Sequence, residues 1–279
     1  MNRITSRQAA LAVPVRRATT TLIVRDGPAR LEVLMVRRSL QASFMPGSYV
    51  FPGGAVDTGD VLPAAPGLCD ENAATLEQRL GRALQLADGA AAHALAGLRE
   101  CFEECGLWLG AAAAEQRPAA DWAALRRQLH GGATLAALAA GAGLVLRTSS
   151  LRPWARWVTP LGAPRRFDTV FVVAPAPADQ APEVDAGETT ALAWVEPAQV
   201  LQPGSGVPLE FATRAVLQTL LPFSGAGDAT GTAALLRHAE TLRDLAPVHP
   251  RLDFGPDGSV RRILMPGDAG YDEAGPAQP

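Results

Sequence analysis

The sequence predicts an α/β fold of the mixed α+β type, in which helices pack on a mixed sheet. Two apolar, β-branched runs at residues 19–25 and 32–38 flank Asp26-Gly27-Pro28, the pattern of two strands joined by a turn. Residues 90–105 follow a helical pattern instead. Strands and helices then mix without a regular β-α-β alternation, which indicates the α+β class or a three-layer mixed sheet.

A third short strand and an insertion follow the first two strands. Residues 48–51 are extended in character, and Pro52-Gly53-Gly54 ends this strand. Residues 61–89 begin with a proline-containing stretch and become helical around residues 73–86. We interpret residues 61–89 as an insertion.

The helix predicted at residues 90–105 has a local signal at each end. Asp88 is a plausible N-cap, because an aspartate side chain can accept from the free amides of the first turn. Gly106 stands where a left-handed C-terminal residue belongs. An alanine-rich segment at residues 121–138 predicts a further helix.

The second half of the chain alternates between strand and helix signals. They predict strands at 154–159, 167–173 and 189–195, a loop at 175–187, helices at 197–201, 209–221 and 232–245, and a hairpin around Asp257-Gly258. The sequence contains no internal repeat. We expect a single domain over residues 1–279, with a C-terminal helical extension at residues 208–279.

Composition narrows the class of protein. The formal net charge of −3 argues against a general nucleic-acid binder, which would be strongly basic. Three cysteines cannot form a disulfide framework, and the longest apolar stretch, residues 135–146, is too short to span a bilayer. The first 25 residues carry five arginines and no acid, but Val13-Pro14 interrupts any amphipathic helix there. We interpret this segment as a frayed N-terminus, not an organellar presequence, and expect a cytoplasmic protein without membrane or nucleic-acid partners.

Three glutamates on the predicted helix carry the chemical signal. Glu100, Glu103 and Glu104 are spaced i, i+3 and i+4, so their carboxylates share one helix face. Like charges at this spacing repel, by about 0.2–0.5 kcal/mol per pair in an isolated helix. The alternatives are a solvated acidic face and a divalent cation bound among the carboxylates. Oxygen ligands of this kind suit Mg²⁺ or Mn²⁺.

The flanking sequence resembles the signature of the Nudix hydrolases. The matching residues are Gly54 in Phe51-Pro52-Gly53-Gly54, followed by Arg99, Glu100, Glu103, Glu104, Gly106 and Leu107. There are two departures from the family pattern. Asp60 replaces the first glutamate, and residues 61–98 number 38 where the family has 7. The resemblance implies an α/β/α sandwich around a mixed sheet, with an insertion inside the motif.

The resemblance also implies roles for the signature residues. Glu103 and Glu104 are expected to bind one or more divalent cations, Mg²⁺ or Mn²⁺, and Glu100 is either a third ligand or the group that positions water. The carbonyl of Gly54 is a candidate ligand, and glycine there allows close approach of the backbone. Arg99 is expected to orient a signature carboxylate without touching the substrate.

In this family a general base or a further metal ligand usually comes from a later loop. Glu188, just before the strand at 189–195, is the first candidate for that role. Glu183 and Asp185 in the same loop are competitors. The alternative for each of the three is an ordinary solvated loop acid.

A further pattern resembles the coenzyme A and acyl-coenzyme A diphosphatases of this family. Arg38, Ser39 and Gly47 match that branch, whereas Ser43 stands where a second arginine belongs. The expected substrate-binding residues are Arg38, Ser39, Arg165, Arg166 and Phe167. Each arginine could instead form a surface ion pair, and the phenylalanine could belong to the core.

These resemblances imply a metal-dependent hydrolase that cleaves the diphosphate of coenzyme A or acyl-coenzyme A. The expected products are 3′,5′-ADP and (acyl-)phosphopantetheine. One alternative is a Nudix pyrophosphatase acting on ADP-ribose, NADH or a dinucleoside polyphosphate. Another is a non-catalytic nucleotide sensor, which the three retained glutamates disfavour. The expected partner is a small-molecule diphosphate, and a homodimer is left open.

Overall fold

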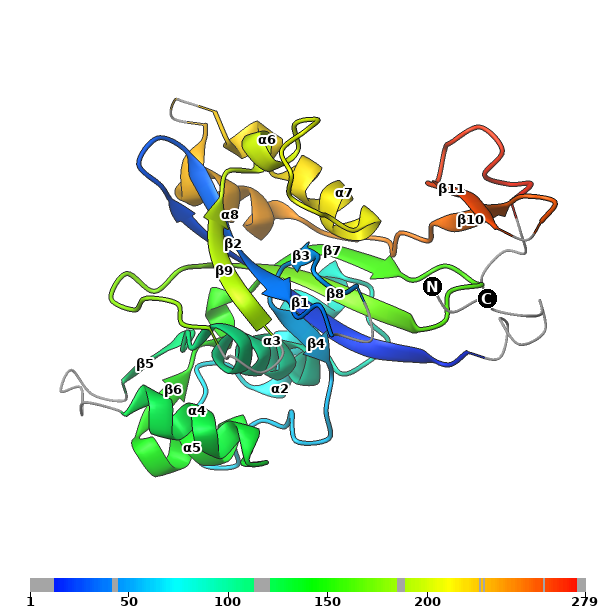
Figure 1. Cartoon of the computed structure of the whole chain (residues 1–279). Coiled ribbons are helices and arrows are strands. Elements are labelled where there is room, and N and C mark those ends of the chain that lie inside the picture. Colours follow the sequence, from blue (N-terminus) through cyan, green and yellow to red (C-terminus); the bar gives the residue numbers. More distant parts are fainter. Residues whose placement is uncertain are drawn as a thin grey trace.

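The architecture comes from a computed structural model of the chain. It describes residues 13–41, 45–112, 121–184, 189–225, 227, 229–257 and 259–274. Within these residues the α+β class is confirmed, since helices cover both faces of a central mixed sheet (Figure 1).

The central sheet is built around the long first strand. Its strands are β1 (Val15–Asp26), β2 (Leu31–Arg38), β3 (Tyr49–Val50), β4 (Gly53–Ala55), β7 (Arg152–Val158), β8 (Arg166–Pro175) and β9 (Thr189–Val195). The order along the sheet is β3-β2-β1-β8-β7, with β4 paired to β1 and β9 paired to β2. Among the described ladders between these strands, β1–β8 is parallel and the others are antiparallel. The sheet is therefore mixed, as the sequence predicts.

One face of the sheet carries the predicted helix with its neighbours. These elements are α2 (Ala73–Leu76), the π-helical turn η1 (Glu77–Gly81), α3 (Ala90–Cys105), α4 (Trp122–His130), α5 (Leu135–Ala142), the short strands β5 (Gly110–Ala112) and β6 (Leu144–Leu146), and the 3-10 turn η2 (Thr148–Ser150). The helix predicted at residues 121–138 is two helices. Gly132, at φ 95°, stops α4, and the Thr134 side chain then caps α5. A glycine pair thus overrides the helical preference of the alanines.

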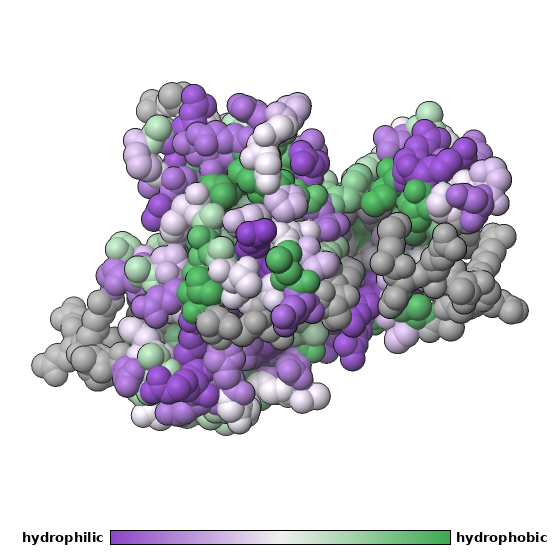
Figure 2. Space-filling model, viewed as in Figure 1, coloured by the Kyte–Doolittle hydropathy of each residue, from purple (hydrophilic) through white to green (hydrophobic). Residues whose placement is uncertain are grey.

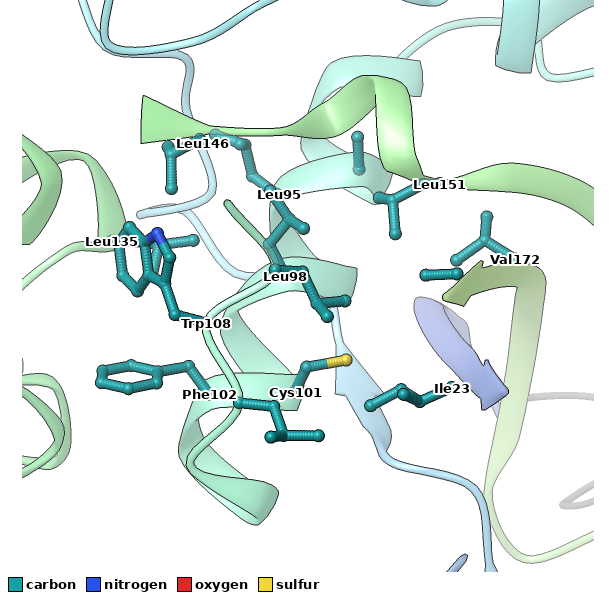
Figure 3. Close-up of a cluster of buried hydrophobic side chains, with 14 of the residues drawn as sticks. Ile23, Leu95, Leu98, Cys101, Phe102, Trp108, Leu135, Leu146, Leu151 and Val172 are labelled. Carbon is teal, nitrogen blue, oxygen red and sulfur yellow. The ribbon is translucent and has the colours of Figure 1, made fainter. Parts of the chain in front are cut away.

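A large apolar core lies between α3 and the sheet. Its members include Ile23, Leu98, Phe102 and Val172, all at or below 2% exposure (Figure 3). Leucines of the insertion, at positions 76, 80 and 84, are buried in the same core. The insertion is consequently integral to the packing of this face.

The C-terminal helices cover the opposite face of the sheet (Figure 1). They are α6 (Pro197–Val200), α7 (Phe211–Thr219), the 3-10 turn η3 (Leu221–Phe223) and α8 (Gly231–Thr241). Trp154 and Trp157 of β7 pack into this second core. Leu209 forms an isolated bridge with Tyr49 of β3, which joins the extension to the sheet.

A separate hairpin follows these helices. Strands β10 (Arg251–Phe254) and β11 (Val260–Leu264) pair only with each other among the described residues. The predicted Asp257-Gly258 turn lies between them, with Gly258 outside the described residues. The outer surface of the hairpin is mainly hydrophilic (Figure 2). Among the described residues, no helix combines the length and the apolar character needed to cross a membrane.

The ends of α3 test the predicted capping residues. The helix spans Ala90–Cys105, and Gly106 adopts φ 68° and donates its N–H to the Phe102 carbonyl, both as predicted. Asp88, however, is not the N-cap: Gly89 occupies that position, and Asp88 pairs instead with Arg17 at 3.4 Å. The N–H of Ala90, in the first turn of α3, donates instead to the carboxylate of Glu77 in the insertion.

Candidate metal-binding and catalytic site

Helix α3 packs unusually close to strand β1. At Gly97, an added Cβ would come within 3.1 Å of the Thr21 hydroxyl and 3.2 Å of the Thr19 methyl group. His93, one turn earlier, forms a hydrogen bond of 2.9 Å between Nδ1 and the Thr19 hydroxyl. These contacts fix the helix against the strand, and they carry the following turn, with Glu100, toward strand β4.

Two of the glutamates, Glu100 and Glu104, lie against strand β4. The Gly53 N–H donates to Oε2 of Glu104 at 3.0 Å. A side chain at Gly54 would overlap the carboxylate of Glu100, and one at Gly53 would overlap the backbone of Thr19. The glycines therefore permit the close approach that the sequence predicts, and they bring backbone groups beside two carboxylates of the signature.

Arg99 joins the signature carboxylates to one another. Its Nε and Nη2 donate to the two oxygens of Asp60 at 2.8 and 3.1 Å, and its Nη1 donates to Glu100 at 2.8 Å and to Glu103 at 2.7 Å. Nη2 also donates to the Ala55 carbonyl at 2.8 Å. Burial alone would lower the pKa of Arg99, but the hydrogen bonds with Asp60 and the charges of the glutamates outweigh it and raise that pKa. Arg99 thus contacts three signature carboxylates, and the role of orienting them stays a prediction.

Asp60 anchors the loop that leads away from β4. Its side chain is 1% exposed, and besides Arg99 it accepts the N–H of Asp57 at 2.7 Å. The aspartate that replaces the first glutamate of the signature therefore reaches Arg99 with both carboxylate oxygens. Since the two buried charges lie in direct contact, the long insertion leaves the connection between the two halves of the motif intact.

The electrostatics at Glu100 favour a cation. Burial raises the pKa of Glu100 to about 7, with Arg99 opposing and Glu103 adding to that shift. A carboxylate in this position gains from a further positive charge, and glutamate oxygens are the donors that Mg²⁺ and Mn²⁺ prefer. Among the described residues no three acidic, histidine or cysteine side chains are already grouped as a metal site. The donor chemistry fits a divalent cation, while Arg99 lies among the acids that would bind it.

The loop with the candidate general bases is described only in part. The Glu183 N–H donates to the Cys105 carbonyl at 2.9 Å, so this loop contacts the C-terminal end of α3. Asp185 and Glu188 lie outside the described residues. Thr189, where β9 begins, pairs with Arg38 of β2. The described ends of the loop therefore lie at the C-terminal end of α3 and beside Arg38, a predicted substrate residue.

Arg38 and Ser39 lie at the end of β2. The Arg38 N–H donates to the Ser48 carbonyl at 3.0 Å, and its carbonyl accepts from Gly47 at 3.2 Å. The Ser39 hydroxyl accepts the Gln41 N–H at 3.2 Å. Ser43, the departure from the branch pattern, lies outside the described residues.

The other predicted substrate residues, 165–167, lie at the start of β8, away from the glutamates. Arg166 is opposite Val15 in β1, whereas Gly54 is opposite Thr19. Four residues along a strand correspond to about 13 Å. The structure does not bring this group to the signature carboxylates.

The surroundings of these residues also differ from an open phosphate site. Arg166 is buried, and its Nε donates to the Thr159 carbonyl at 3.1 Å. Arg165 is exposed, and Phe167 is partly buried. The Phe167 backbone pairs with Thr159 through both its N–H and its carbonyl. This arrangement favours a structural role for Arg166 at the start of β8.

Two anchors of α3 have no local signal in the sequence. Glu77, in the insertion, accepts the Ala90 N–H at 2.8 Å, and Arg126, in α4, donates to the Glu103 carbonyl at 2.8 Å. Both residues are distant in sequence from the groups that they bind. An alignment of relatives that share the insertion is the signal that could have identified them.

Comparisons with known proteins agree with the motif. A family model described as the NUDT19 Nudix domain matches residues 8–205. An acyl-coenzyme A diphosphatase NUDT19 of Gallus gallus is 32% identical over 203 residues, covering 58% of this chain and 52% of that protein. A protein of Caenorhabditis elegans named as a nudix hydrolase is 27% identical over 168 residues, covering 59% of this chain and 46% of that protein. The chain spans about half the length of the curated relatives it matches.

The fold is also found in a solved structure. The crystal structure of a NUDIX hydrolase from Alicyclobacillus acidocaldarius is 29% identical, with a TM-score of 0.59. The similarity covers 74% of this chain and 91% of that one. The predicted α/β/α sandwich is therefore confirmed by fold similarity as well as by the observed layers.

Proposed function

The chain belongs to the family described by the NUDT19 Nudix domain model, within the Nudix hydrolases, and from this premise we propose that it hydrolyses coenzyme A or acyl-coenzyme A. The bond cleaved is the diphosphate, and the products are 3′,5′-ADP and (acyl-)phosphopantetheine. The name of the Gallus gallus relative supports the substrate class. The single observation that carries the reaction type is the set of Arg99 contacts with Asp60, Glu100 and Glu103.

We propose that a divalent cation, Mg²⁺ or Mn²⁺, is held by Glu100, Glu103 and Glu104, with the Gly54 carbonyl as a further donor. Such a cation, when bound, neutralises charge on the diphosphate and makes a bound water more acidic. The hard oxygen donors on one face of α3, held beside strand β4 by Gly53 and Arg99, support this proposal.

The chain's own residues then have separate tasks. Gly53 holds the Glu104 carboxylate through its N–H, and Arg99 holds the carboxylates of Glu100 and Glu103 in place. For the proton of the attacking water we propose Glu188 as the base, with Glu183 and Asp185 as the alternatives.

We propose that Arg38 and Ser39, next to the start of β9, contact the substrate phosphates. Arg165, Arg166 and Phe167 stay predictions for the part of the substrate farther from the diphosphate, because of their position at the start of β8. An arginine can bind phosphate through two parallel hydrogen bonds, which suits Arg38 to this task.

Product analysis by mass spectrometry tests the substrate class. The purified protein is incubated with Mg²⁺ or Mn²⁺ and a mixture of coenzyme A, acetyl-coenzyme A, ADP-ribose, NADH and a dinucleoside tetraphosphate. We expect 3′,5′-ADP to form first and fastest. Faster turnover of ADP-ribose or NADH would contradict the coenzyme A assignment and keep the catalytic helix. No turnover with either cation would contradict the coenzyme A assignment and favour an untested substrate or the non-catalytic nucleotide sensor.

The variant Glu103→Gln tests the assignment of the acidic helix. It removes a charged oxygen donor while keeping a side chain that can accept from Arg99, so the fold should persist. We expect turnover to be abolished, with an unchanged thermal midpoint, because a bound cation would lose a charged ligand. The matched control is Glu240→Gln on α8, where Glu240 forms an exposed ion pair with Arg152 of β7. This variant should leave turnover unchanged. Near-normal turnover of Glu103→Gln would overturn the metal-site assignment.

A further inference from the structure

The C-terminal turn of α3 is held by groups from three parts of the chain. The last carbonyls of a helix have no partner within the helix, so they must bond elsewhere. The Gly106 N–H donates to the Phe102 carbonyl at 3.0 Å, and the Glu183 N–H donates to the Cys105 carbonyl at 2.9 Å. The carbonyl of Glu103, a signature residue, accepts hydrogen bonds from the guanidinium of Arg126 in α4.

Arg126 contacts two segments at once. Its Nε and Nη2 donate to the Glu103 carbonyl at 2.8 and 2.6 Å. Its Nη1 faces the other way and donates to the carbonyls of Glu183 at 3.0 Å and Val184 at 3.4 Å. One planar guanidinium therefore joins the end of the catalytic helix to the segment that leads into the loop before β9.

The partners of Arg126 indicate a positioning task. Every hydrogen bond that the structure shows for its side chain goes to a backbone carbonyl, so the contact depends on the backbone path of both segments. A positive charge at the C-terminal end of a helix also interacts favourably with the helix dipole. A lysine could keep that charge but not the fork that reaches both segments.

We propose that Arg126 is a positioning residue of the hydrolytic site. It holds the backbone of Glu103 and the segment at residues 183–184 in a fixed relation, so that the carboxylates of α3 and the chain entering the loop keep their places during turnover. This inference rests on the proposed function. A displacement of about 1 Å in a catalytic group can lower a rate by about 10²-fold, so loss of the anchor should affect kcat.

Three variants test this proposal, with kinetics and amide hydrogen exchange as readouts. Arg126→Ala removes the anchor, and Arg126→Lys keeps the charge but not the fork. Arg127→Ala is the matched control, because Arg127 is an exposed neighbour on the same helix, without a side-chain hydrogen bond or ion pair among the described residues. For Arg126→Ala we expect kcat to fall at least tenfold with KM within about twofold. Arg126→Lys should be intermediate, and Arg127→Ala should match the wild type.

Amide hydrogen exchange tests whether Arg126 acts by holding the end of α3 and residues 183–184 in place, because activity alone does not report on these two segments. In Arg126→Ala, amide exchange should accelerate in peptides covering Gly106 and residues 181–184, and stay unchanged in β1 and β8. A wild-type kcat for folded Arg126→Ala would overturn the proposal, and so would a lowered kcat with unchanged exchange in both segments. If Arg126→Ala does not fold, Arg126→Lys decides by the same two readouts. A wild-type enzyme inactive on every substrate would overturn the proposed function, whereas the exchange experiment would still decide the anchor.

Discussion

The two ends of helix α3 are anchored by different parts of the chain and serve different needs. At the N-terminal end, Glu77 of the insertion accepts the Ala90 N–H. At the C-terminal end, Arg126 and the Glu183 N–H bind the carbonyls of Glu103 and Cys105. Ala90 and Glu103 are about 20 Å apart along the helix axis, at 1.5 Å per residue. A change at the first end should therefore affect stability, and a change at the second should affect turnover.

The insertion has the character of a structural brace for the first end. The Arg79 side chain of η1 donates to the Thr148 carbonyl at 2.9 Å and pairs with Glu71. From β7, Arg156 donates to the Leu84 carbonyl at 3.2 Å and is itself held by Asp168. These contacts, together with the buried leucines, join the insertion to β7 and to the turn before it.

The largest expected effect of a substitution on stability is at Asp60, the partner of Arg99, which lies between the two ends of α3. Asp60→Ala removes the buried carboxylate that binds Arg99 and the Asp57 N–H, while Glu100 and Glu103 still pair with the guanidinium. We therefore expect a loss of about 1–3 kcal/mol in the free energy of unfolding. Turnover should be lost with it. Urea unfolding provides the measurement, and Asp60→Glu, the residue of the family pattern, is the control. A loss below about 0.5 kcal/mol would show that the contact between Asp60 and Arg99 does not stabilise the fold.

His93 gives the N-terminal half of α3 a pH dependence. Burial, with Arg17 nearby, lowers the pKa of His93 to about 4, whereas in the unfolded chain that pKa is near 6.5. Between these values the unfolded chain binds a proton that the native state does not. The free energy of unfolding should therefore fall by about 3 kcal/mol as the pH falls from 6.5 to 4, from this residue alone.

Urea unfolding at pH 7, 6, 5 and 4 measures the contribution of His93. The variant His93→Asn keeps a polar group near Thr19 and cannot titrate in this range. The stability of the wild type should decline more steeply with falling pH than that of the variant. Parallel curves for the two proteins would contradict a buried neutral histidine.

Glu77 tests whether the first end affects stability alone. Glu77→Ala leaves the Ala90 N–H without its partner, and loss of a helix N-terminal cap costs about 0.5–2 kcal/mol. We expect that loss in thermal or urea unfolding, with kcat per folded molecule unchanged. Glu77→Gln keeps an oxygen acceptor and should recover part of the stability. A tenfold fall in the kcat of Glu77→Ala would remove the distinction between the two ends.

The smallest effect is expected at Asp88. Its ion pair with Arg17 is 3.4 Å long and exposed on both sides, and such pairs contribute at most about 1 kcal/mol. Asp88→Ala should change the free energy of unfolding by less than about 0.5 kcal/mol. A loss near that of Glu77→Ala would restore Asp88 as the effective cap of α3.

Local patterns predicted most elements because each depends on residues close in sequence. The spacing around Gly106 ends α3 where predicted, and the strand at residues 189–195 has the predicted bounds. The helix at residues 121–138 was predicted as one element because alanines suggest continuity, whereas the glycines at 131 and 132 break it. The single domain, the cytoplasmic location, the homodimer and the substrate contacts stay predictions.

The sequence by itself determined the chemistry of the site. Three glutamates at i, i+3 and i+4, an arginine before them and two glycines upstream identify the family and the acidic face of α3, because helix periodicity places side chains from local order alone. The tertiary structure decided which groups hold that face. Glu77 and Arg126 bind the ends of α3 from distant segments. Arg166 lies at the start of β8, away from the glutamates. Such contacts depend on the path of the folded backbone, and no local pattern of residues encodes that path.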